Sequence, residues 1–216
     1  MRRWVVGVMV LTWLVGAVPP PAEALGPFQL YGNALAVREG KGRAEFAIEL
    51  SSRCAAGAPA CVNNGSLTYS GIAFKPDRPL RFSELRELSA EYRFKVGDCA
   101  GGSPRFQVNV DTDADGKSDG DLWIYIGPFP NFTSCVSGWQ NTGNMLQATD
   151  ARFDLSQFPG GKLFSTAAEA QALLGARSVV GVQFVVDGGW RLPGPTGQVI
   201  LVDQLQVAGQ TFTAGR

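Results

Sequence analysis

The sequence contains no histidine among its 216 residues. This absence excludes catalytic triads that depend on histidine, His-ligated zinc and haem sites, and the commonest general base near neutral pH. The chain has no net charge, with 19 basic and 19 acidic residues, and this balance argues against a nucleic-acid binder, which needs a basic surface. No long apolar run occurs after the first two dozen residues. We therefore expect no nucleic-acid partner and no membrane span in the mature protein.

The N-terminal segment has the features of a signal peptide. Arg2 and Arg3 precede an uncharged run over residues 4–18, three prolines follow, and Ala22-Glu23-Ala24 matches the small-x-small cleavage pattern. An uncleaved membrane anchor is the alternative, but the apolar run is short for a span. We predict a signal peptide over residues 1–24, a single β-sandwich domain over residues 25–216, and a secreted, periplasmic or cell-surface location.

All four cysteines lie in the predicted mature chain, at Cys54, Cys61, Cys99 and Cys135. An even number in an exported protein indicates disulfides, and four cysteines allow three pairings. The short segment between the first two favours a local bridge, which leaves Cys99 to pair with Cys135. A metal site is the competing interpretation, but the chain has neither a C-x-x-C motif nor a histidine.

Alternating apolar and polar residues predict a protein made of strands. Residues 88–96, 105–110, 122–126 and 180–186 alternate with a period of two, and residues 199–207 are more uniformly apolar. One short helix is expected over residues 166–174, where Thr166 and Glu169 have the spacing of a capping box and Gly175 follows. The expected fold class is all-β: an antiparallel, jelly-roll-like β-sandwich with one short helix.

An acidic segment between two predicted strands has the spacing of a calcium-binding loop. Acids occupy loop positions 1, 3, 5 and 9, and Gly116 occupies position 6. Position 7 would contribute its backbone carbonyl, and position 12 is Leu122 instead of a bidentate glutamate. The predicted structural Ca²⁺ ligands are Asp111, Asp113, Asp115, Lys117, Asp119 and Asp121. A polar hairpin turn without metal is the alternative.

The strands on either side of this loop also predict a ligand-binding face. If their apolar residues point inward, the outward side chains are Arg105, Gln107, Asn109, Trp123 and Tyr125. Aromatic rings stack on the apolar faces of sugars, and the other three side chains can hydrogen-bond hydroxyl groups. The alternative is that a loop covers the two rings, so that they extend the core.

Two resemblances accompany these patterns. The segment from Asp98 to Phe106, the acidic loop, Tyr125-Ile126-Gly127-Pro128 and Cys135 resemble secreted bacterial β-sandwich domains of undefined function. The last strand, Leu201 to Val207, is similar to that of jelly-roll carbohydrate-binding modules. The acidic loop resembles the calcium loops of dockerin and thrombospondin type-3 repeats. These likenesses imply a secreted, disulfide-bonded sandwich.

Three functions follow from the sequence. The first is a non-catalytic, calcium-stabilised module that binds a polysaccharide or glycan. The second is a structural or adhesive cell-surface protein that binds another protein. The third is a polysaccharide-cleaving enzyme, which could use two carboxylates without histidine, but no pair is singled out by the sequence. Fold class alone does not distinguish the three, because sandwiches support all of them.

Overall fold

The computed structural model describes residues 27–39, 46–53, 68–78, 80–188 and 197–214. The predicted signal peptide, Cys54 and Cys61 lie outside these ranges. No helix within the described ranges has both the length and the apolar character that a membrane span requires.

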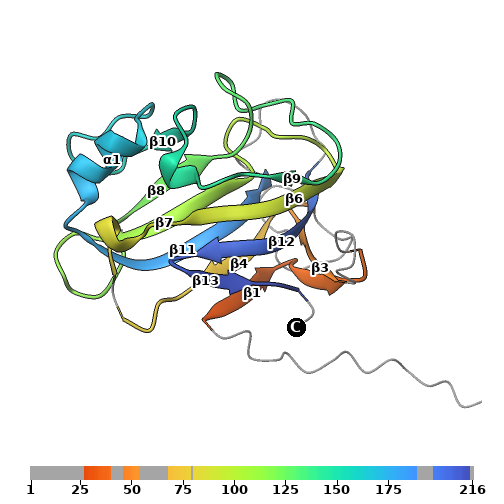
Figure 1. The fold of residues 1–216 in the computed structure, drawn as a ribbon, viewed down its shortest axis with the longest axis horizontal. Coiled ribbons are helices and arrows are strands. Elements are labelled where there is room, and N and C mark those ends of the chain that lie inside the picture. The colour runs from red at the N-terminus through yellow and green to blue at the C-terminus, as the bar shows by residue number, and fades with distance from the viewer. Residues whose placement is uncertain (1–26, 40–45, 54–67, 79, 189–196, 215–216) are drawn as a thin grey trace, which may run out of the picture.

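Two antiparallel sheets form the fold (Figure 1). The first, sheet A, has the strand order β1 (Phe28–Gly32), β4 (Tyr69–Phe74), β11 (Ser178–Asp187), β7 (Arg105–Asp111), β8 (Gly120–Tyr125) and β10 (Arg152–Asp154), with β5 (Leu80–Arg81) paired to β11. The second, sheet B, has the order β2 (Leu35–Val37), β3 (Ala47–Ser51), β12 (Val199–Val207), β6 (Leu88–Val96) and β9 (Gln140–Asn141), with β13 (Gln210–Phe212) paired to β12.

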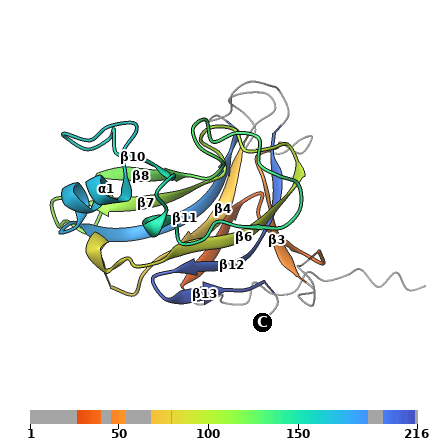
Figure 2. The same cartoon turned by 45° about the horizontal axis from the view of Figure 1, so that its top comes forward.

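The rotated view shows the strands of the two sheets (Figure 2), and buried hydrophobic side chains from both sheets form one core cluster. Alternation places Leu88, Ala90 and Tyr92 of β6 against the core, and likewise Phe106 and Val108 of β7. Each of these side chains is almost fully buried, as expected when one face of a strand packs on the opposite sheet. The predicted all-β antiparallel sandwich with one short helix is therefore confirmed for the described residues.

The helix also agrees with its sequence pattern. Helix α1 (Ala167–Leu174) begins after Thr166, whose hydroxyl accepts a hydrogen bond from the Glu169 backbone N–H, and Glu169 caps Thr166 in return. Gly175 follows, but with a right-handed φ of −52° instead of a left-handed cap. Position 175 has no room for a side chain, since a Cβ there would lie 2.5 Å from the Gln171 carbonyl oxygen. Two 3₁₀ turns, Phe82–Glu84 and Met145–Gln147, complete the helical structure of the described residues.

A disulfide joins Cys99 to Cys135, two residues 36 apart in sequence. The first precedes β7 and the second follows β8, so the bridge links the two segments that flank this hairpin. This pairing is the one that the sequence predicted for these two cysteines.

Candidate functional site

The outer face of sheet A carries the polar residues that the sequence singled out, arranged in two rows across the strands. Strand register defines the arginine row, which crosses six strands as Tyr31, Gly71, Val185, Arg105, Tyr125 and Arg152. It also defines the amide row, which crosses them as Gln29, Ala73, Gln183, Gln107, Trp123 and Asp154. Beside the amide row, Asn109 of β7 pairs with Asp121 of β8.

The two rows differ in exposure, which corrects part of the sequence prediction. Arg105 and Tyr125 were expected on an open surface, but only 4% and 1% of their respective surfaces are exposed. Gln107, Asn109 and Trp123 are half-buried instead. The arginine row is therefore covered along its centre. The accessible part of the face is the amide row from Gln29 to Trp123 with its neighbours Asn109 and Asp121, whereas Asp154 at the end of that row is buried.

Tyr125 is covered by aromatic and cationic groups. The Arg152 guanidinium lies 4.3 Å from the centre of the Tyr125 ring and 3.9 Å from that of Phe164, so it sits close to both rings. Phe132 approaches Tyr125 edge-on, and the Tyr125 hydroxyl donates a 2.8 Å hydrogen bond to Asp154. Burial, followed by this hydrogen bond, raises the pKa of Tyr125. Tyr125 is thus part of the packing, in agreement with the alternative that a loop covers it.

Hydrogen bonds connect side chains from the arginine row, the amide row and the Asn109–Asp121 pair into one network. The Tyr31 hydroxyl donates to Gln183 Oε1 at 2.7 Å, and Gln183 Nε2 donates to Asn109 Oδ1 at 3.2 Å. Asn109 Nδ2 and Gln107 Nε2 then donate to the two oxygens of Asp121, at 2.7 and 3.0 Å. The network extends over strands β1, β11, β7 and β8 and holds each amide in a fixed orientation.

Arg105 anchors this network from the covered row. Its guanidinium donates to Gln107 Oε1 at 3.3 Å, to the Gly102 carbonyl at 3.0 Å and to Asp187 Oδ2 at 3.1 Å. It also lies 5.9 Å from the Trp123 ring centre. Since the Arg105 side chain is only 5% exposed, it fixes the orientation of Gln107 and neighbours Trp123 without itself being open to a ligand.

A glycine makes room for the Tyr31 end of the network. A Cβ on Gly71 would lie within 2.7 Å of Tyr31 Cζ and 2.5 Å from the Phe184 carbonyl oxygen. Tyr31 can therefore lie over β4 and reach Gln183 on β11 only because position 71 has no side chain. Burial raises the pKa of Tyr31, so its hydroxyl stays protonated and remains a donor at neutral pH.

Aromatic rings lie at both ends of the accessible face. Tyr69 is 57% exposed and its ring centre lies 6.1 Å from that of Tyr31, on the β1–β4 side. Trp123 lies on β8. The sequence prediction missed Tyr31, Tyr69 and Gln183. Gln183 does alternate outward in its predicted strand, but no sequence pattern shows that this strand lies beside β7.

The carboxylates of the acidic loop fall into two groups: three lie together in a cluster, and the others have different partners. Asp111, Asp113 and Asp115 each offer an oxygen within 4.8 Å of the other two. Asp111 is buried, and its oxygens accept hydrogen bonds from the backbone N–H groups of Asp113, Ala114 and Gly116. Three of the six predicted calcium ligands are therefore brought together at positions 1, 3 and 5 of the loop.

The other three predicted ligands have different partners. Asp119 accepts from the backbone N–H and hydroxyl of Thr112, both at 2.7 Å, and the hydroxyl bond, followed by the backbone bond, lowers the pKa of Asp119. Asp121 belongs to the amide network of sheet A. The Lys117 ammonium forms an ion pair with Asp115 at 3.3 Å. The structure thus separates Asp121 from the loop cluster.

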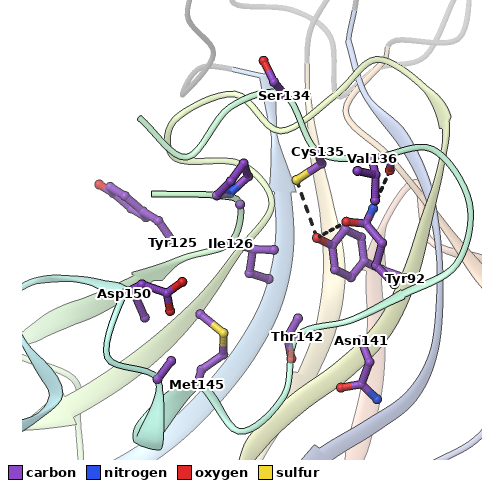
Figure 3. Close-up of a pocket in the computed structure, with 15 residues that line it drawn as sticks. Tyr92, Tyr125, Ile126, Ser134, Cys135, Val136, Asn141, Thr142, Met145 and Asp150 are labelled. Atoms are coloured by element: carbon purple, nitrogen blue, oxygen red, sulfur yellow. Dashed lines mark hydrogen bonds between the residues drawn. The ribbon is translucent and has the colours of Figure 1, made fainter. Parts of the chain in front are cut away.

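A pocket of about 260 Å³ lies at the edge of the sandwich, between the middle of β6, the end of β8 and the segments on either side of β9 (Figure 3). The Tyr92 hydroxyl donates to Gln140 Oε1 at 3.3 Å and lies 3.6 Å from Cys135 Sγ. Burial, and then the nearby Asp98 charge, raises the pKa of Tyr92 to about 12. Asp150 is the one acidic residue, and there is no basic one, among the described residues that line it. This pocket suits a small ligand, in contrast to the extended face of sheet A.

Comparisons with known proteins give no family assignment. No family model matches the chain, and no curated protein matches it. Among solved structures, the chain is similar to one described as an exo-beta-agarase, with a TM-score of 0.38 and 15% sequence identity. The alignment covers 88% of this chain and 23% of that chain, so the chain spans about a quarter of its length.

Proposed function

We propose that the protein is an exported carbohydrate-binding module whose binding surface is the amide row of sheet A with Asn109, Asp121 and Tyr69. The observation that carries the proposal is the hydrogen-bonded run of Tyr31, Gln183, Asn109 and Asp121 across the sheet. The predicted leader and the Cys99–Cys135 disulfide support export.

The surface is suited to hydroxyl-rich ligands because its polar side chains are held in place by hydrogen bonds and can still form further ones. Within the network, each of the Gln107, Asn109 and Gln183 amide nitrogens donates one of its two hydrogens. The remaining hydrogens can be donated to sugar oxygens, and Asp121 can accept from sugar hydroxyls. Because the side chains already hold one another in place, binding orders few rotamers.

The rings supply the apolar part of the interaction. Trp123 lies beside Gln107 in the amide row, and Tyr69 lies beside the ring of Tyr31 at the other end of the hydrogen-bonded run. Aromatic side chains pack against the C–H faces of sugars. A mixed surface of rings and amides favours a saccharide over a purely apolar ligand.

The test is a binding screen of the purified, oxidised protein against soluble and insoluble polysaccharides, including cellulose, xylan, mannan and agarose. Trp123→Ala and Tyr69→Ala are each expected to weaken binding about tenfold or more. Trp139→Ala, whose ring lies beside Arg93 of sheet B, serves as the matched control and should bind normally. Tyr69 is exposed, so its variant should remain folded. Absence of binding by the folded protein to every polysaccharide would overturn the proposal.

We also propose that Asp111, Asp113 and Asp115 hold a structural calcium ion. Three carboxylates converging at positions 1, 3 and 5, followed by a glycine with φ of +84°, provide hard oxygen ligands on a sharply turned loop. The cluster fits calcium in donor type, although the Asp119 and Asp121 carboxylates are engaged elsewhere. Backbone oxygen and water would complete the coordination shell.

Calcium binding is testable through stability, because an ion bound only by the folded state raises the unfolding temperature. Calcium at 100 times its dissociation constant would add about 2.7 kcal/mol. The expected result is a lower Tm after chelation and no response to calcium in Asp113→Ala/Asp115→Ala. An unchanged Tm with excess calcium and with chelator would refute the site.

Binding to another protein is the second candidate function, and it has its own supporting observation. Phe129 and Val136 are each 67% exposed, and both belong to the segment between β8 and β9. Contiguous apolar patches at the surface are typical of protein contacts, and these two side chains would have to form part of one. This function predicts concentration-dependent association in sedimentation velocity that Phe129→Ser reduces. A monomer at all concentrations would count against self-association through this segment.

A further inference from the structure

We propose that the pocket between β6, β8 and the segments beside β9 is a second binding site, and that its ligand is a small organic cation: a protonated amine on a compact, mainly apolar body. The proposal does not rest on the carbohydrate-binding face of sheet A. It follows from the size of the pocket, from the single sign of charge on its walls and from the hydrogen-bonding groups that those walls leave available.

The size and lining of the pocket limit the ligand to a small molecule with an apolar body. Its volume of about 260 Å³ is slightly below the range of about 300–1,000 Å³ that is usual for pockets of drug-sized ligands. A single substituted ring fits this space, whereas a polymer chain does not. The apolar part of the lining comes from Ile126, Pro128, Met145, Ala148 and Ala151, against which the C–H surface of such a ring can pack.

The charge on the described walls is negative and comes from one residue. Figure 3 shows the Asp150 carboxylate directed into the pocket, beside Met145. In the part of the chain that the structure describes, no hydrogen bond or ion pair engages this carboxylate. Arg152, two positions along, does not line the pocket; its guanidinium lies 3.9 Å from the centre of the Phe164 ring and donates to the Leu163 carbonyl. A positive group can therefore approach Asp150 without displacing a partner.

The hydroxyl groups of the pocket favour a ligand that donates hydrogen bonds. The Tyr92 hydroxyl donates to Gln140 Oε1 at 3.3 Å, and the Thr142 hydroxyl donates to the Gly143 carbonyl at 2.8 Å. Both hydroxyl hydrogens are thus used within the protein, while the Tyr92 oxygen and the Asp150 carboxylate can still accept. An ammonium group has three donors and no acceptor, so it complements these atoms, whereas an anionic group would meet Asp150 without a cation to offset it.

A second cavity provides an internal comparison. It has a volume of about 320 Å³ and is lined by both Asp77 and Arg78. Its walls carry both signs of charge, so they offer no preference for a cation. Asp77 is therefore a matched carboxylate, in a cavity of similar size, on which the same substitution can be made as a control.

The test uses three probes that share one ring and differ in charge: cyclohexylammonium, cyclohexanol and cyclohexanecarboxylate. Each is titrated to millimolar concentration into the ¹⁵N-labelled protein and followed by amide chemical shifts. The cation should bind about fivefold more tightly than the alcohol, as expected for a charge pair that stays partly solvated, and the carboxylate should not bind. Asp150→Asn should remove the advantage of the cation and leave cyclohexanol unchanged. Asp77→Asn should alter neither.

A second variant tests whether the cation lies inside the pocket. Ala148 is half-buried in the lining, so Ala148→Leu should fill the space and abolish binding of both the cation and the alcohol while the amide spectrum shows a folded protein. Cation binding that persists in Ala148→Leu would place the probe on an exposed carboxylate outside the pocket and overturn the proposal. Equal affinity of the wild type for the cation and the alcohol, or no binding of the cation, would also overturn it.

Discussion

Replacement of Gly71 by alanine tests whether the outer face is built as described. The new methyl group would meet Tyr31 on one side and the backbone carbonyl of Phe184 on the other, at 2.5 Å from the latter. A backbone carbonyl within a ladder cannot move away as a flexible side chain can. Overpacking of this kind costs about 1–3 kcal/mol, and loss of the Tyr31–Gln183 hydrogen bond adds about 1 kcal/mol.

The expected loss for Gly71→Ala is therefore about 2–4 kcal/mol, which corresponds to a fall in Tm on the order of 10 °C for a chain of this size. Equilibrium urea unfolding followed by tryptophan fluorescence measures it directly. Gly181→Ala is the matched comparison, because its nearest neighbour would be the tip of the Asn109 side chain at 2.7 Å. Rotation of that side chain would break its hydrogen bonds with Gln183 and Asp121, but no backbone would have to move. Gly181→Ala should cost less. Equal stability of Gly71→Ala and wild type, or the reverse order, would refute the reasoning.

Three further predictions concern stability away from the face. Cys99→Ser/Cys135→Ser removes a bridge between residues 36 apart, so the free energy of unfolding should fall by about 4 kcal/mol in urea titrations; a change under about 1 kcal/mol would contradict this. Thr166→Ala removes the helix cap and should cost about 1 kcal/mol, measured in the same way. Hydrogen bonds from the Thr166 backbone and then from Lys162 lower the pKa of Glu169. Its stabilisation is thus present above the ordinary glutamate pKa and is lost as pH falls through the folded-state value. Glu169→Gln should flatten the acid side of the Tm–pH curve, and an unchanged curve would exclude the contribution.

The alternation of apolar and polar residues predicted the strands of this fold well, because the buried face of each strand can be identified from that strand's own sequence. The alternation over Leu88–Val96 and the apolar run over Val199–Val207 correspond to β6 and β12. The capping box at Thr166 marks the start of α1. These features depend on interactions between residues a few positions apart, which a single sequence displays directly.

The face of sheet A was only partly predictable, because it depends on which strands become neighbours. Tyr31 and Gln183 are 152 residues apart, and Gln183 and Asn109 are 74 apart, yet each pair is hydrogen-bonded. The position of β11 between β4 and β7 cannot be predicted from the sequence of any one strand. Alternation identified the outward direction of Arg105 and Tyr125 correctly, but not their burial, since the groups that cover them come from distant segments.

The position of the disulfide relative to the acidic loop has a consequence for how the chain responds to cleavage. Cys99 and Cys135 close a covalent ring that contains both β7 and β8, and exposed loop residues such as Asp113 and Lys117 lie between those strands. A protease that cuts this loop leaves both strands attached to the molecule through the bridge. The nicked protein would keep its mass and its sheet until the disulfide is reduced. A cut in the loop would therefore separate the carboxylates of the Asp111, Asp113 and Asp115 cluster without releasing either strand.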